Sequence, residues 1–267
     1  MSDAEAPIGI FDSGVGGLTV FRAIKRRLPE ESLIYLGDTA RVPYGSKSGA
    51  AVTRYALACA EILLKQDVKL LVVACNTASA HALDALRDEL DVPVLGVIEP
   101  GARLAVERTR TGTVGVIGTV STIRSAAYQD ALTALAPGLR VHAKACPLFV
   151  PLADEGWTEG GIPEAVARAY LDELKELGID VLVLGCTHYP LLRPVIGNVM
   201  GPEVELIDSA ETTATVVEGV LDGIGLSAPS GNTPSFQYKV TDSPEAFAEV
   251  GARFLGHPID NVEWVDF

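Results

Sequence analysis

One stretch decides the fold: Leu70-Leu71-Val72-Val73-Ala74-Cys75-Asn76-Thr77. Its pattern recurs at Val181-Leu182-Val183-Leu184-Gly185-Cys186-Thr187-His188. Each stretch begins as an apolar run with β-branched residues, which predicts a strand buried in a parallel sheet. Alanines, leucines and charges at helical spacing over residues 79–90 predict a helix after the first run. We therefore expect both cysteines at the carboxyl edge of a sheet, where open α/β folds bind their ligands.

The position of the two cysteines suggests chemistry at their sulfur atoms. A helix that begins directly after a strand offers unpaired N–H groups and a partial positive charge. Such a site lowers the pKa of a thiol, to roughly 3.5–7.5 in known cases, and we expect this for Cys75 and Cys186. One such cysteine would suggest a nucleophile, whereas two on matching strand ends suggest a pair of bases.

The composition argues against several classes of protein. The chain has 267 residues and a formal net charge of −14, without a cluster of lysine and arginine. Such a chain is a poor partner for nucleic acid or an anionic membrane, because neutralising phosphate requires cations. No apolar run approaches the roughly 18 residues of a membrane span, and the N-terminal segment lacks the features of a signal peptide. We expect a cytoplasmic protein with neither nucleic acid nor membrane as a partner.

The other cysteines and the histidines do not suggest a metal site. The four cysteines are widely separated and form no CxxC motif, which argues against a zinc ribbon, a thioredoxin-type centre and a disulfide framework. Cys59 lies among alanines of a predicted helix and Cys146 precedes a proline, so we interpret both as structural. Of the four histidines, only His188 lies near a key cysteine. We expect no bound metal.

A glycine-rich turn follows the first predicted strand, residues 8–11, as Asp12-Ser13-Gly14-Val15-Gly16-Gly17. Such a turn lets backbone N–H groups approach an anion. A dinucleotide fingerprint starting at Gly14 would require glycine at position 19, where Thr19 stands, and no P-loop lysine follows. The sequence favours a small carboxylate here, with a tight turn that binds nothing as the alternative.

The chain reads as two related halves. The segment at residues 114–119 repeats the pattern of residues 8–13, and each half then closes with a strand and a cysteine. We expect an α/β protein with two similar, doubly wound, flavodoxin-like lobes, mainly parallel sheets, and an active site in the cleft between the lobes. The first lobe would hold residues 1–97 and 209–267, and the second residues 98–208. Residues 98–101 could mark the crossover, and the C-terminal strands would extend or edge a sheet.

Several chemistries compete for the two thiols. A cysteine phosphatase requires C-x5-R, but after Cys186 that position holds Leu192, and no arginine lies close after Cys75. A cysteine-dependent amidase could use Cys186 and His188 but leaves Cys75 unexplained. A two-base proton transfer explains both: one thiolate takes a proton from a carbon and the other sulfur, as a thiol, delivers one to the opposite face. The carbon is inverted without a cofactor.

Here the sequence resembles the aspartate/glutamate racemase family, and within it most closely the glutamate racemases. The resemblance runs from residue 8 to about residue 210. Its segments, each weak alone and specific in combination, are Ile8-Gly9-Ile10-Phe11-Asp12-Ser13-Gly14-Val15-Gly16-Gly17, Pro43-Tyr44-Gly45, Ala74-Cys75-Asn76-Thr77, residues 146–156, and Gly185-Cys186-Thr187-His188-Tyr189-Pro190.

The resemblance implies cofactor-independent interconversion of L- and D-glutamate, which supplies D-glutamate for peptidoglycan synthesis. Cys75 would take the α-proton from D-glutamate and Cys186 that from L-glutamate. The auxiliary acid–base residues would be Asp12, His188 and one acid of the pair Asp154-Glu155, at which we place Asp154. The substrate-binding residues would be Asp12, Ser13, Pro43, Tyr44, Gly45, Asn76, Thr77, Thr187 and His188, with Thr119 and Thr122 as further hydrogen-bond donors from the second half.

Other functions stay open at this point. An aspartate racemase or another amino-acid racemase of the same family would share both thiols. A cysteine-dependent amidase would tolerate loss of Cys75, and a non-catalytic relative would bind glutamate without exchanging its α-proton. We expect glutamate as the small-molecule partner and a homodimer, with a monomer as the alternative.

Overall fold

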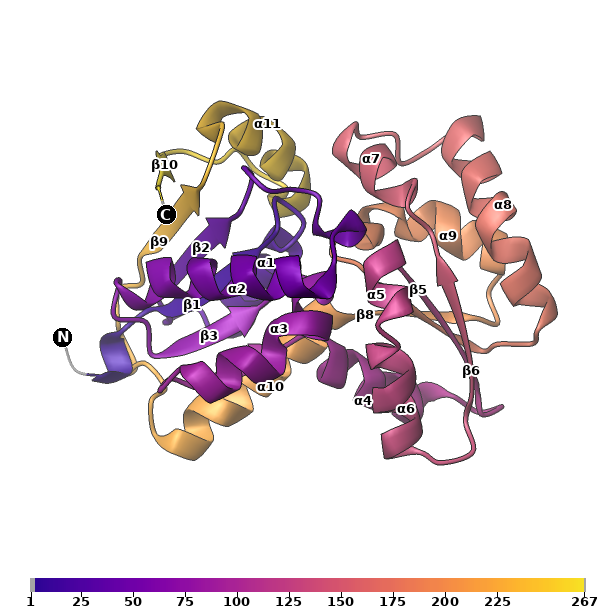
Figure 1. Cartoon of the computed structure of the whole chain (residues 1–267), viewed down its shortest axis with the longest axis horizontal. Helices are drawn as coiled ribbons and strands as arrows, with labels where there is room; N and C mark the ends of the chain where they lie inside the picture. Colours follow the sequence, from indigo (N-terminus) through magenta and orange to yellow (C-terminus); the bar gives the residue numbers. More distant parts are fainter. Residues whose placement is uncertain (1–2, 267) are drawn as a thin grey trace.

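Two parallel sheets organise the molecule (Figure 1). The computed structural model describes residues 3–266, whose strands form one six-stranded and one four-stranded sheet. Every strand pair is parallel. The first sheet has the order β10-β9-β2-β1-β3-β4 and the second β6-β5-β7-β8. The strands are β1 (Ile8–Asp12), β2 (Leu33–Gly37), β3 (Leu70–Val73), β4 (Val94–Gly96), β5 (Thr113–Gly118), β6 (Arg140–Ala145), β7 (Val181–Gly185), β8 (Glu205–Asp208), β9 (Phe236–Val240) and β10 (Val262–Trp264).

The strand order confirms the internal repeat. The run β2-β1-β3-β4 in the first sheet corresponds to β6-β5-β7-β8 in the second. The strands that precede Cys75 and Cys186, β3 and β7, therefore occupy equivalent positions. The C-terminal strands β9 and β10 extend the first sheet beyond β2, as expected. The predicted α/β class with two similar lobes is confirmed.

Helices cover both faces of each sheet (Figure 1). In the first sheet, α1, α10 and α11 pack on one face and α2 and α3 on the other. In the second, α4 and α6 cover one face, and α7, α8 and α9 the other. No helix within residues 3–266 is long and apolar enough to cross a membrane. The helices are α1 (Leu18–Arg27), α2 (Gly49–Leu64), α3 (Asn76–Glu89), α4 (Ile98–Arg108), α5 (Val120–Arg124), α6 (Ala127–Leu135), α7 (Phe149–Asp154), α8 (Gly161–Glu176), α9 (Arg193–Met200), α10 (Ser209–Ile224) and α11 (Pro244–Leu255), with short 3-10 turns η1 (Asp3–Glu5), η2 (Tyr44–Ser46) and η3 (Tyr189–Leu192).

The alternation of side chains along β1 shows why these runs are apolar throughout. Ile8 and Ile10 pack with α1 and α10, whereas Phe11 packs with α2 and α3. All three side chains are fully buried. Because both faces of the sheet are covered, a strand of this kind has no solvent-facing position for polar residues.

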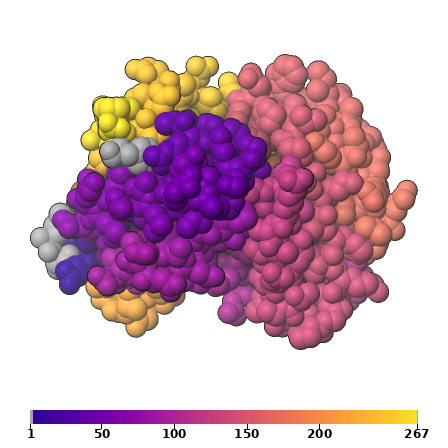
Figure 2. Space-filling model, in the orientation of Figure 1, coloured from indigo at the N-terminus to yellow at the C-terminus, as the bar shows by residue number. Residues whose placement is uncertain are grey.

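The chain passes between the two sheets after β4 and again after β8. Ile98 and Ala102 of α4 pack on the second sheet, so the predicted crossover at residues 98–101 is the first turn of a helix. After β8, Ala214 and Val217 of α10 pack in the cluster beneath the first sheet, together with α1. The helices α10 and α4 contact each other, and the two lobes lie directly side by side, the first at the left and the second at the right of Figure 2.

A buried ion pair lies at the amino ends of β2 and β3 in the first sheet. Lys69 Nζ lies 2.6 Å from Glu31 Oε2, and both side chains are almost fully buried. Lys69 also donates to the carbonyls of Ala4 and Leu226, and Glu31 accepts a hydrogen bond from the backbone of Ala228. The pair therefore joins segments that lie far apart in the chain.

Candidate active site

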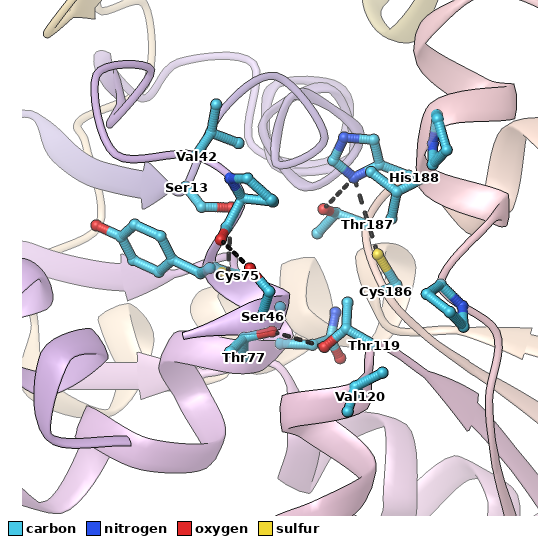
Figure 3. A pocket seen from close by; sticks show the side chains of 17 residues that line it. Ser13, Val42, Ser46, Cys75, Thr77, Thr119, Val120, Cys186, Thr187 and His188 are labelled. Carbon is cyan, nitrogen blue, oxygen red and sulfur yellow. Dashed lines mark hydrogen bonds between the residues drawn. The ribbon is translucent and has the colours of Figure 1, made fainter. Parts of the chain in front are cut away.

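A cavity of about 190 Å³ lies where the carboxyl ends of the two sheets meet. Both lobes line it, and both Cys75 and Cys186 face into it from opposite sides (Figure 3). Binding sites for drug-sized ligands measure about 300–1,000 Å³, so this cavity suits a smaller metabolite. The lining residues are Ser13, Val42, Pro43, Tyr44, Gly45, Ser46, Cys75, Asn76, Thr77, Thr119, Val120, Pro147, Val150, Pro151, Cys186, Thr187 and His188.

Cys75 caps the N-terminus of α3, as the sequence predicts. Its sulfur accepts a hydrogen bond from the backbone N–H of Ala78 at 3.5 Å and lies 3.7 Å from Ser13 Oγ. The expected lowering of its pKa is nevertheless wrong. Burial, with the nearby charge of Asp12, raises the pKa of Cys75 to about 12 and outweighs the helix N–H groups. Cys75 is therefore a neutral thiol, which is the proton-donating form.

Cys186 differs from Cys75 in its local structure. It directly follows β7, but a turn and then η3 separate it from α9, so the expected α-helix start directly after this cysteine is wrong. Pro190 stands in the first turn of η3 and Pro194 in that of α9, where proline's missing N–H is tolerated. The Sγ atom of Cys186 lies 3.8 Å from His188 Nδ1 (Figure 3). The partner of this thiol is thus a side chain instead of a helix end.

His188 joins Cys186 to Asp154. One ring nitrogen faces the cysteine sulfur, and the other, Nε2, lies 3.2 Å from Asp154 Oδ1. Burial by itself would lower the pKa of His188, but the Asp154 carboxylate and the Cys186 sulfur outweigh it and raise this pKa well above the ordinary value. Asp154 is the acid of the Asp154-Glu155 pair that contacts His188, whereas Glu155 is exposed.

We expect the Asp154→Asn substitution to lower the pKa of His188, because an amide supplies no negative charge to the ring. In the wild-type protein the raised pKa stabilises the folded state fully below pH 6.5, and this contribution is lost as the pH rises through the folded-state value. As the pH rises above 6.5, the free energy of unfolding of the variant should therefore fall less than that of the wild-type protein. NMR titration of the ring protons measures the shift, with exposed Glu155→Gln as the matched control. An unchanged pKa in Asp154→Asn would contradict the ion pair.

Asp12 lies behind the cavity wall instead of in it. It ends β1, is fully buried, and accepts a hydrogen bond from the backbone N–H of Gly14 at 3.0 Å. Burial raises the pKa of Asp12, and the charge of His188 opposes this. Its other oxygen has no hydrogen-bond partner among the described residues. The negative charge of Asp12 is one cause, after burial, of the raised pKa of Cys75.

Threonines from both lobes meet at the floor of the cavity. Thr77 Oγ1 lies 3.1 Å from Thr119 Oγ1 (Figure 3). It also lies 3.0 Å from Thr122 Oγ1. Thr119 lines the cavity, while Thr122 is buried beneath it. Nearby, the carbonyl of the Asn76 side chain accepts a hydrogen bond from Tyr128, and the Asn76 Nδ2 atom has no partner among residues 3–266. This buried amide is a donor without an acceptor in a wall of the cavity.

The segment around Tyr44 approaches the cavity from the first lobe. A cis peptide bond joins Val42 to Pro43. The Tyr44 hydroxyl donates a hydrogen bond to the buried carboxylate of Asp38, which also accepts one from Thr241. Tyr44 therefore lines the cavity, while its hydroxyl connects this segment through Asp38 to Thr241, the residue after β9.

A comparison with known proteins shows to which family the chain belongs. The family model described as Asp/Glu/Hydantoin racemase matches residues 8–217. The chain belongs to this racemase family.

Individual members of the family resemble the chain over almost its whole length. A glutamate racemase from Geobacter metallireducens is 57% identical over 255 residues, which cover 96% of this chain and 94% of that protein. The crystal structure of a glutamate racemase isoform from Bacillus anthracis has a TM-score of 0.95 and 42% identity and covers 98% of both chains. That of the Francisella tularensis glutamate racemase in complex with D-glutamate has a TM-score of 0.92 and 38% identity, again over 98% of both.

The structure brings most of the predicted site residues to one cavity in this racemase-family chain. Asp12, Thr122 and Asp154 are the exceptions, since they stand behind the cavity wall and contact residues that line it. The glycines of residues 14–17 do not line the cavity, so the expectation that this turn cradles an anion is not supported there. The lining residues that sequence reasoning missed are Val42, Ser46, Val120, Pro147, Val150 and Pro151, the first two of which flank the Pro43–Gly45 segment.

Proposed function

We propose that this protein is a glutamate racemase that inverts the α-carbon by proton transfer between two thiols, without a cofactor or metal. The observation that carries the proposal is that Cys75 and Cys186 face one small cavity from opposite lobes. The D-glutamate complex of the Francisella tularensis relative supports glutamate as the substrate. The protein would supply D-glutamate for peptidoglycan synthesis.

The neutral thiol of Cys75 suits one direction of the reaction directly. In the conversion of L-glutamate, the thiolate of Cys186 takes the α-proton while the neutral thiol of Cys75 gives its proton to the opposite face. His188 and Asp154 hold the proton balance beside Cys186, and Asp12 does so beside Cys75. The roles reverse for D-glutamate, where Cys75 must lose its proton. The ammonium group of the substrate would favour that thiolate by placing a positive charge in the cavity.

Stabilising the carbanion requires hydrogen-bond donors, because its charge spreads onto the α-carboxylate. The unpartnered Nδ2 of Asn76 and the hydroxyls of Ser13, Thr77 and Thr187 are neutral donors in the cavity wall. Oriented donors in a site of low dielectric stabilise such charge strongly. Pro43, Tyr44, Gly45 and Thr119 would complete the substrate site, and Thr122 would support Thr119 from behind.

The chemistry also bears on location and assembly. Both thiols must be free, and reducing compartments such as the cytoplasm keep them so, which supports a cytoplasmic protein.

We also propose a homodimer in preference to a monomer. The apolar side chains Leu148, Trp157 and Ile162 of the second lobe are each more than half exposed and offer a surface for it.

The test is incubation of purified protein with L-glutamate in D₂O. We expect the circular dichroism signal of L-glutamate to decay, and the D-glutamate formed to carry deuterium at the α-carbon. Release of ammonia would instead indicate an amidase, and faster turnover of aspartate would indicate a different racemase of the family. Binding of glutamate without loss of the α-proton would overturn the proposal.

A further inference from the structure

Two glycines of the first lobe lie against side chains of the second lobe. A Cβ atom at Gly16 would lie 2.2 Å from Thr187 Oγ1 and 2.5 Å from His188 Nδ1. A Cβ at Gly45 would lie 2.7 Å from Thr119 Cβ and 2.8 Å from its Cγ2. Real Cβ atoms essentially never approach other heavy atoms within 3.0 Å. The lobes could not meet as they do with any larger residue at either position.

The partner side chains have little freedom to move aside. Thr119 caps α5, with its hydroxyl accepting a hydrogen bond from the backbone of Thr122. The ring of His188 is held by Asp154 on one edge and packs against Phe254 with ring centroids 5.2 Å apart. Thr187, the nearest neighbour of Gly16, lies with its Oγ1 atom 3.4 Å from His188 Nδ1. Because Thr119 and His188 are each held by several contacts, we expect a methyl group at either glycine to be accommodated by separation of the lobes.

Other glycines of the same turn behave differently. At Gly17, an added Cβ would meet Asp12 and Ala74 of its own lobe. At Gly14, its only neighbour within 4 Å would be the Val42 side chain of the same lobe, at an ordinary contact distance of 3.4 Å. None of these positions has the positive φ that favours glycine. The requirement at Gly16 is therefore a close approach between lobes and not a backbone conformation.

We propose that Gly16 and Gly45 are positioning residues that set the distance between the two lobes, and with it the distance between Cys75 and Cys186. Gly16 allows the β1 turn to approach the segment after β7 closely, and Gly45 allows η2 to approach the start of α5. Transfer of a proton to each face of one carbon requires both sulfurs within reach of it at once. A displacement of about 1 Å can reduce such a step by about 10²-fold.

The test uses the Gly16→Ala variant, with Gly14→Ala as the matched control and Gly45→Ala as a second variant. Each is incubated in D₂O with L-glutamate and, separately, with D-glutamate. We expect Gly16→Ala to lower the rate of inversion by about 10–100-fold. With at least one of the two enantiomers as the starting material, deuterium incorporation into the recovered starting material should fall less than the rate of inversion does. The reason is that a single cysteine can still exchange a proton on its own face. Gly14→Ala should invert glutamate within about twofold of wild type.

The outcomes separate this inference from the proposed function on which it rests. If the wild-type protein neither inverts glutamate nor exchanges its α-proton, the proposed function fails. If wild type is active and Gly16→Ala inverts glutamate within about twofold of it, the positioning role is wrong. A parallel fall of exchange and inversion for both enantiomers would also overturn it, since that result indicates general damage. If the Gly16→Ala variant does not fold, the Gly45→Ala variant is judged by the same criteria.

Discussion

Purified Cys75→Ala and Cys186→Ala variants should each lose racemisation by at least about 10²–10⁴-fold, the usual contribution of one positioned acid–base group. Each variant retains one sulfur on one side of the cavity, so neither can both remove and return a proton on opposite faces. The variants should stay folded, because replacing a buried cysteine with alanine removes a single atom from a large core. Circular dichroism of L- or D-glutamate measures the loss.

Cys146→Ala provides the matched control for these variants. Its side chain is fully buried like those of the two candidate bases, but it packs in the cluster with Phe149 and Leu184 and does not line the cavity. The hydrogen bond from Tyr189 goes to its carbonyl, which alanine keeps. This variant should racemise glutamate at close to the wild-type rate. Near-full activity of Cys75→Ala or Cys186→Ala would rule out the two-base scheme.

The Lys69→Met substitution should have the largest effect on stability. It leaves the carboxylate of Glu31 buried without its cation and removes the donor to the carbonyls of Ala4 and Leu226. Removing one partner of a buried ion pair typically costs about 3–5 kcal/mol in the free energy of unfolding. For a chain of this size, each kcal/mol lowers the melting temperature by about 2–4 °C. Thermal and urea unfolding would measure the loss.

A double variant distinguishes the ion pair from simple packing. Lys69→Met combined with Glu31→Leu removes both charges, and we expect it to recover a large part of the lost stability. The exposed pair of Arg168 and Glu164 provides the control, since Arg168→Met should change the free energy of unfolding far less than Lys69→Met does. A Lys69→Met variant as stable as wild type would show that the buried charges contribute nothing.

The sequence patterns were most informative where a single local cause sets the structure. The apolar runs before Cys75 and Cys186 became equivalent strands because a sheet covered on both faces excludes polar side chains. Asp154 was named as an auxiliary acid only through the resemblance to a family, and its contact with His188 was not predicted. No periodicity in the chain joins those two residues, which meet through the packing of α7 against η3.

Features that depend on three-dimensional packing could not be predicted in this way. The lowered pKa expected for Cys75 was a local argument about a helix end, and it failed because burial depends on every surrounding element. Val120 and Val150 could not be distinguished from core residues by their type, although they line the cavity. Gly16 looked like part of an anion-binding turn, but its lack of a side chain is required by His188 from the other lobe.

The pairing of β9 with β2 has a consequence during synthesis. On a ribosome, β2 emerges early, whereas its neighbour at residues 236–240 is made only after the whole second sheet. Until then, the nascent chain presents residues 33–37 as an unpaired edge, and such edges readily join strands from other molecules. A strand translated after the second sheet therefore covers this edge and closes off this route to aggregation.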